Sequence, residues 1–202
     1  MVINWYGEAS FRIQSGDFVL LSDPFDASSG LAPPRFKASL ILRTEAGRPI
    51  PYERDETPTI LGAGEYEVQG NQVTGIGIPG GDDKKILTAY AVNLEDIRLG
   101  FLGYASEPPT PEALEMLGGC DILFVPAGGA PFLSPEAAAK IVKQVNPKIA
   151  VASLFRVPGL KRKAGDVKEF LDEFGQKPAP EEKLVVKKKD LPQGTQVKVL
   201  TL

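Results

Sequence analysis

The chain changes its pattern about halfway along, and this change restricts the fold more than any other feature. Up to about residue 102, short apolar runs are separated by turns containing glycine or proline, which is typical of successive β-strands. From residue 110 onward, helical and strand patterns alternate. The combination favours a single α/β domain over residues 1–202, with many strands and few helices.

The first half predicts an antiparallel meander followed by further strands. Expected strands cover residues 2–6, 9–13, 18–21, 39–42, 64–68, 72–78, 86–93 and 97–102. The segment 44–57 is polar, contains proline and shows neither a helical nor a strand period. We therefore expect a loop there, and its order is left open.

Three helix starts can be recognised in the second half. Thr110 and Ser134 each precede a proline and a glutamate, the pattern of a hydroxyl N-cap with proline at the first helical position. Asp166 is followed three residues later by Glu169, which predicts a capping box. Intervening and closing strands are expected at 121–125, 148–152, 184–186 and 196–200.

Histidine is absent from all 202 residues. The chain therefore cannot form a histidine-ligated metal centre, a histidine-based catalytic triad or histidine acid–base machinery. Cys120 is the sole cysteine, so no intrachain disulfide can form, and it is expected to be a small core residue. This cysteine usage favours a cytoplasmic location.

The charge balance points away from nucleic acids and membranes. The net charge is −3, and no window has the apolar length of a membrane span. Two basic clusters, 161–163 and 187–189, are expected to be solvated surface, with polyanion binding as the alternative.

Two motifs near the N-terminus are shared with a known family. The run Asn-Trp-Tyr-Gly-Glu-Ala-Ser-Phe at 4–11, with Leu-Ser-Asp-Pro-Phe at 21–25, resembles the start of the metallo-β-lactamase superfamily. It is most similar to the UlaG-like branch of small Zn-dependent hydrolases of the β-lactamase fold. The likeness continues at 31–42, 62–68, 122–129 and 136–140. It implies a four-layer αββα sandwich with a metal site at one edge between the two sheets.

The resemblance also implies where metal ligands would stand. Aligned on this chain, the ligand positions fall at Glu8, Glu45, Gly47, Pro49, Ile50, Asp82, Tyr104 and Leu154. Glycine, proline, isoleucine and leucine side chains have no donor atom. The tyrosine takes the place of the family's bridging aspartate. We therefore expect that the metal ligands have been lost.

The resulting hypothesis is a non-catalytic pseudoenzyme with no cofactor and no catalytic residue, which binds an unknown small molecule or protein. One alternative is a metal-dependent hydrolase in which Glu8, Glu45 and Asp82 hold a hard cation such as magnesium or calcium. Another is a structural protein whose fold serves self-association as a homo-oligomer.

The individual positions keep their own alternatives. The three carboxylates are expected to be polar replacements in a cleft, paired with arginines such as Arg43, Arg48 or Arg156, unless they hold a metal. Tyr104 either fills the vacated space or acts as a general acid or nucleophile. Apolar Ile50, Leu154 and Phe155 would line that space. The turn 126–131 is either scaffold or an anion-binding turn.

Overall fold

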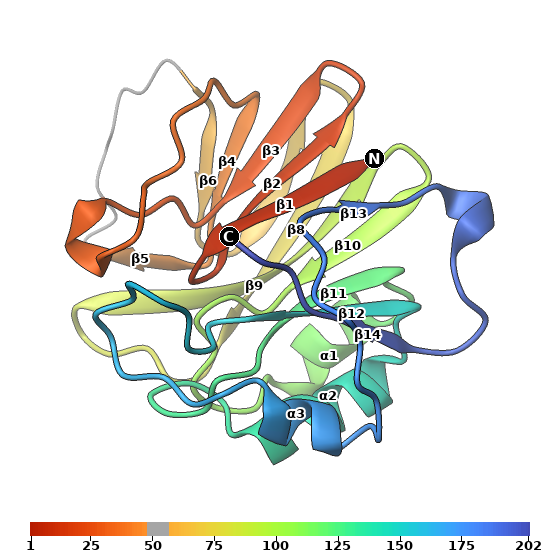
Figure 1. Ribbon diagram of the computed structural model, residues 1–202. Coiled ribbons are helices and arrows are strands. Elements are labelled where there is room, and N and C mark those ends of the chain that lie inside the picture. The colour runs from red at the N-terminus through yellow and green to blue at the C-terminus, as the bar shows by residue number, and fades with distance from the viewer. Residues whose placement is uncertain (48–56) are drawn as a thin grey trace.

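The computed structural model describes residues 1–47 and 57–202, and two β-sheets dominate it (Figure 1). The first sheet has six strands in the order β13–β1–β2–β3–β4–β6. The expected meander is confirmed, because β1, β2 and β3 pair antiparallel, whereas β4 and β6 add parallel strands. The strand bounds are β1 Val2–Gly7, β2 Ser10–Ser15, β3 Phe18–Ser22, β4 Leu40–Arg43, β6 Thr59–Leu61 and β13 Leu184–Val185.

The second sheet has eight strands. Seven follow the order β14–β12–β11–β10–β9–β8–β7, and β5 pairs with β9 beside them. The part built from β7 to β10 is antiparallel, whereas β10, β11, β12 and β14 run parallel. The bounds are β5 Glu45–Gly47, β7 Gly64–Val68, β8 Asn71–Ile78, β9 Lys85–Leu94, β10 Ile97–Phe101, β11 Ile122–Pro126, β12 Ile149–Ser153 and β14 Gln196–Lys198.

The described residues form three α-helices, which lie on the side of the second sheet (Figure 1). They are α1 Pro111–Leu117, α2 Pro135–Val145 and α3 Lys168–Asp172. The first two starts are confirmed: the Thr110 hydroxyl accepts from the Ala113 amide, and Ser134 accepts from the Ala137 amide. The prediction of a capping box at the start of α3 is wrong. Asp166 accepts instead from the Lys168 amide, and the N-cap is Val167, which makes no side-chain cap bond.

The core lies between the two sheets and under the helices. Phe11 of β2 packs against Phe124 of β11 with ring centroids 4.6 Å apart, and Phe101 of β10 stacks on Phe124 at the same distance. Each fully buried aromatic side chain of this kind contributes roughly 1.5–3 kcal/mol. The two-sheet α/β fold is thus confirmed. The described residues before Thr110 form one helical segment, the 3₁₀ helix η1 Ala27–Ser29. The α-helical layer of the described structure therefore lies on the second sheet.

The prediction of a loop over residues 44–57 is wrong at the start of that segment. Residues 45–47 form β5, which pairs antiparallel with β9 in the register Glu45 to Leu87. The strand that pairs with β5 lies about forty residues further along the chain, so no local sequence period predicts β5. Residues 48–56, the greater part of the expected loop, lie outside the described residues. Another 3₁₀ turn, η2 Lys188–Asp190, comes between β13 and β14. No described helix is long and apolar enough to cross a membrane.

Candidate functional site

The carboxyl ends of several strands meet at one edge of the two sheets. Glu8 follows β1, Thr44 follows β4, Tyr104 lies just beyond β10 and Leu154 follows β12. Hydrogen bonds join the sheets here: among them, the Leu154 amide donates to the Glu8 carbonyl at 3.2 Å, and the Tyr104 amide donates to the Thr44 hydroxyl at 3.4 Å. The edge therefore gathers Glu8, Tyr104 and Leu154, three of the predicted positions.

Left-handed backbone conformations concentrate at this edge. Glu8, Asp23 and Leu154 have φ values of +48°, +38° and +60°, and Gly103 has +49°. A non-glycine residue in this region costs roughly 1–2 kcal/mol, and such residues cluster where a fold holds a site in a fixed geometry. The backbone of a site is thus present at the edge between the sheets.

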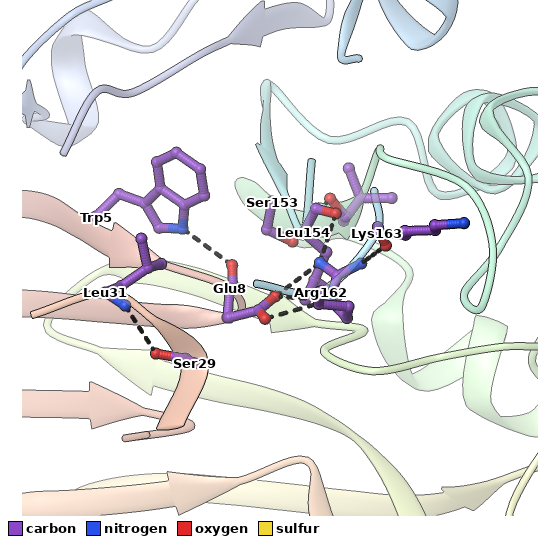
Figure 2. A network of polar contacts seen from close by, with 9 residues as sticks. Trp5, Glu8, Ser29, Leu31, Ser153, Leu154, Arg162 and Lys163 are labelled. Carbon is purple, nitrogen blue, oxygen red and sulfur yellow. Dashed lines mark hydrogen bonds and ion pairs between the residues drawn. The ribbon is translucent and has the colours of Figure 1, made fainter. Parts of the chain in front are cut away.

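Glu8 is held by an arginine from a distant part of the chain (Figure 2). Arg162 Nη2 donates to Glu8 Oε2 at 2.7 Å, and Nε lies 3.2 Å from both carboxylate oxygens. The two side chains are only 22% and 9% exposed. This is a short, charge-assisted pair in a mostly desolvated position, the class that contributes most.

The same guanidinium contacts three further groups. Nη2 also donates to the Leu154 carbonyl at 3.0 Å, and Nη1 donates to the Lys163 carbonyl at 3.0 Å. The Phe132 ring centroid lies 4.9 Å from the guanidinium carbon, within cation–π range. The expectation that Arg162 belongs to a solvated basic cluster is therefore wrong. This residue is a centre of contacts at the candidate site.

Asp23 is a carboxyl group of the site with a strongly raised pKa. Its carboxylate is buried and accepts from the Thr44 amide and the Thr44 hydroxyl, both at 2.7 Å. Burial raises the pKa of Asp23 from 3.8 to about 7, against the opposing effect of the two Thr44 hydrogen bonds and of Arg43. This carboxyl therefore exchanges its proton near neutral pH, and sequence reasoning did not assign it a role.

Tyr104 packs against the hydrophobic core and against Phe132, with ring centroids 5.5 Å apart. Burial raises the pKa of the Tyr104 phenol above its ordinary value, and the nearby carboxylates of Asp23, Glu8 and Glu45 raise it further. The phenol thus stays protonated at neutral pH. It therefore offers no phenolate nucleophile at that pH.

The remaining predicted positions have separate partners. Glu45 pairs with Lys85 at 2.9 Å across β5 and β9, and Gly47 is exposed at the end of β5. Asp82 lies in the β8–β9 turn, where its Oδ1 accepts from the amides of Lys84 and Lys85 at 2.7 and 2.9 Å. Pro49 and Ile50 lie outside the described residues. Glu8, Glu45 and Asp82 are therefore not brought together as one group.

Two of the three expected arginine partners of these carboxylates, Arg43 and Arg156, are also wrong. Arg43 donates to the Pro24 carbonyl at 3.5 Å, and Arg156 pairs with Asp166 at the surface. Arg48 lies outside the described residues. Arg162 and Lys85 take the roles expected of these arginines, because the fold brings β1 to the segment after β12, and β5 to β9.

The turn at 126–131 serves as scaffold. The Gly128 carbonyl accepts from the Gly165 amide at 2.7 Å, which ties the turn to the segment that carries Arg162. A side chain at Gly128 would collide with the backbone of Leu154 and Phe155. The glycine is therefore needed for the close approach of two backbones beside Leu154.

The comparisons with known proteins agree with this architecture. A family described as "Beta-lactamase superfamily domain" matches residues 2–153. The chain belongs to the metallo-β-lactamase superfamily. A crystal structure of a candidate Zn-dependent hydrolase of this superfamily from Thermotoga maritima is 24% identical, with a TM-score of 0.79 over 98% of this chain and 97% of that one.

Two more distant structures share the fold. The metallo-β-lactamase fold protein YhfI from Bacillus subtilis is 10% identical, with a TM-score of 0.62 over 98% of this chain and 95% of that chain. Igni18, a metallo hydrolase from Ignicoccus hospitalis, is 13% identical, with a TM-score of 0.60 over 97% and 94%. At these identities the likeness concerns the fold. Comparison with curated proteins gave no match.

The metal that this superfamily implies does not fit those residues at the edge that the structure describes. A zinc or iron centre needs imidazole, thiolate or free carboxylate donors arranged around one point. Leu154 offers no side-chain donor, the Tyr104 phenol stays protonated, and both Glu8 oxygens already accept from Arg162. Within residues 1–47 and 57–202, no three His, Cys, Asp or Glu side chains are grouped so that they could hold a metal ion.

Proposed function

We propose that this protein is a non-catalytic member of the metallo-β-lactamase superfamily, of the UlaG-like kind, which acts by binding. The observation that supports this proposal is the Glu8–Arg162 ion pair. Glu8 directly follows β1 at the edge of the sheets, and its carboxylate is engaged by Arg162. A guanidinium stays protonated at every physiological pH and cannot serve as a base. The pair therefore organises the edge without supplying a nucleophile.

Hydrolysis in this fold rests on a hydroxide generated at a bound metal. Among the residues that the structure describes, the side chains at the edge offer no replacement for that step. Asp23 exchanges a proton near neutral pH, but the carboxyl and the Thr44 hydroxyl that donates to it are both buried, so a substrate has no access to the pair. On this proposal, the role of the fold is to bind a small molecule or a protein. We also propose a cytoplasmic location on the basis of the cysteine usage.

A hollow beside β1 supports binding of a small molecule. Its volume is about 270 Å³, and its walls combine aromatic and aliphatic side chains with a few polar groups, the usual makeup of a ligand site. The lining residues are Asn4, Trp5, Tyr6, Leu31, Ala32, Glu182, Thr201 and Leu202. Trp5, the sole tryptophan of the chain, lines this hollow and packs against Phe155 in the core, so its fluorescence follows changes in the packing beside the hollow.

Metal analysis paired with a phosphodiesterase and esterase screen tests the proposal. The protein is purified with zinc, manganese or magnesium present, and we expect substoichiometric metal and no turnover. Stoichiometric metal with turnover that is lost in Glu45→Ala, but kept in the exposed control Glu67→Ala, would overturn it in favour of the carboxylate-metal hydrolase. Trp5 fluorescence titrations and light scattering then distinguish a small-molecule ligand from a protein partner or self-association.

A further inference from the structure

The oxygen atoms around Arg162 come from two separate segments as well as from its own. Glu8 supplies two carboxylate oxygens from the β1–β2 turn, Leu154 supplies a carbonyl oxygen from the end of β12, and Lys163 supplies one from the residue after Arg162. Within the described residues, this guanidinium donates to four oxygen atoms. This is the environment of a cation rather than of a simple pair of surface charges.

The backbone holds this environment at an energetic cost. Both Glu8 and Leu154 adopt left-handed φ values, and the Leu154 amide donates to the Glu8 carbonyl at 3.2 Å. The Trp5 indole donates to the same carbonyl at 3.0 Å (Figure 2). The backbone at Glu8 and Leu154 is thus fixed by contacts other than those with Arg162, so the chain segments that carry these oxygens do not depend on the arginine alone for their positions.

We propose that the Glu8 carboxylate and the Leu154 carbonyl form an internal cation site, and that Arg162 is its resident cation in place of a metal. The proposal rests on the proposed function, since it explains how the edge stays organised without metal. Charge balance supports it: a carboxylate that is only 9% exposed needs a positive partner, and Arg162 is the one cation that the described structure pairs with it. When Arg162 is shortened, the site should accept a small external cation.

Thermal unfolding of Arg162→Ala provides the test, with guanidinium chloride or manganese chloride as the probe and sodium chloride at equal ionic strength as the reference. Loss of one partner from a mostly buried pair should lower the Tm by roughly 10 °C. A probe at about ten times its Kd should then restore roughly 3–6 °C in a saturable manner. Arg156→Ala is the matched control, because Arg156 lies on the same segment in an exposed pair with Asp166.

Saturable stabilisation of Arg162→Ala by either cation supports the proposal, provided that Arg156→Ala and the unmodified protein show none. Its absence with both cations overturns the proposal. The double variant Glu8→Gln with Arg162→Ala should lose the effect, and persistence there would also overturn it. These outcomes are separate from those for the proposed function, which fails on metal and turnover in the unmodified protein.

Two further variants keep the test decisive if Arg162→Ala does not fold. Arg162→Met and Arg162→Lys both fill the space with an unbranched side chain, but only lysine carries the charge. The cation site predicts that Arg162→Lys unfolds several degrees above Arg162→Met. Equal Tm values for the two variants would show that Arg162 acts by packing and would overturn the proposal.

Discussion

The carboxylate of Asp23 accepts two hydrogen bonds from one residue, the amide and the hydroxyl of Thr44, both at 2.7 Å. The two residues directly follow the parallel strands β3 and β4. Thr44 also accepts from the Tyr104 amide, so this contact joins the first sheet to the loop after β10. A titratable group thus lies within the connection between the sheets, which makes the connection sensitive to pH.

The stability of the protein should fall as the pH rises through neutrality. Burial raises the pKa of Asp23 from 3.8 in a model peptide to about 7 in the folded protein. The folded state therefore binds this proton more tightly than the unfolded chain. Its contribution to stability is full below about pH 4 and is lost as the pH rises through about 7, with a size on the order of a few kcal/mol.

Urea unfolding of Asp23→Asn between about pH 5 and about pH 8 checks this dependence. The neutral amide should flatten the loss of unfolding free energy over this range. Asp26→Asn is the control, because Asp26 is exposed and its pKa is lowered by Ser28, so its titration falls outside the window. Parallel profiles for the unmodified protein and Asp23→Asn would contradict the role given to Asp23.

Thr44→Val should move the same pH profile. The Thr44 hydroxyl bond lowers the pKa of Asp23 against the effect of burial, so its loss raises that pKa further. The loss also leaves a buried carboxylate oxygen without a partner, which costs roughly 1–3 kcal/mol near neutral pH. Thr44→Ser keeps the hydroxyl and should retain most of the stability. Similar unfolding free energies for the two variants would argue against the bond.

Much of the fold could be predicted from local patterns. The strand meander, the proline-led helix starts at Thr110 and Ser134, and the buried strands of the second half all depend on residues close together in sequence. The short strand β5 could not be predicted in this way, because its three residues become a strand only through pairing with β9. That the whole of residues 1–202 forms one domain stays a prediction.

The candidate site was predicted only in part. The resemblance placed Glu8, Tyr104 and Leu154 at one edge, and the structure brings them together there. Arg162 was missed because it lies between two exposed lysines in sequence, and its contact with Glu8 spans 154 residues. Asp23 carried a usable signal: an acid directly after the apolar strand β3 is placed to be buried, and buried acids have shifted pKa values.

Gly103→Ala should destabilise the protein more than an alanine at another left-handed glycine. Gly103 has a φ of +49°, and a side chain there would collide with the hydroxyl and side-chain carbons of Thr44. Gly16 has a φ of +55° and open space around it, so Gly16→Ala should show only the backbone cost of roughly 1–2 kcal/mol. Thermal unfolding compares the two. Equal losses of Tm in the two variants would mean that the loop after β10 shifts and relieves the collision with Thr44.

The thiol of Cys120 should be unreactive in the folded protein. Cys120 is 3% exposed, and burial raises its pKa to about 11, so both access and thiolate fraction are low at physiological pH. We expect a disulfide reagent such as DTNB to label the native protein far more slowly than the urea-unfolded chain, where one thiol per chain reacts at once. Cys120→Ala gives the background rate. Rapid labelling without urea would show that the core opens near Cys120. The labelling rate therefore also measures how often the packing of α1 against the second sheet opens transiently.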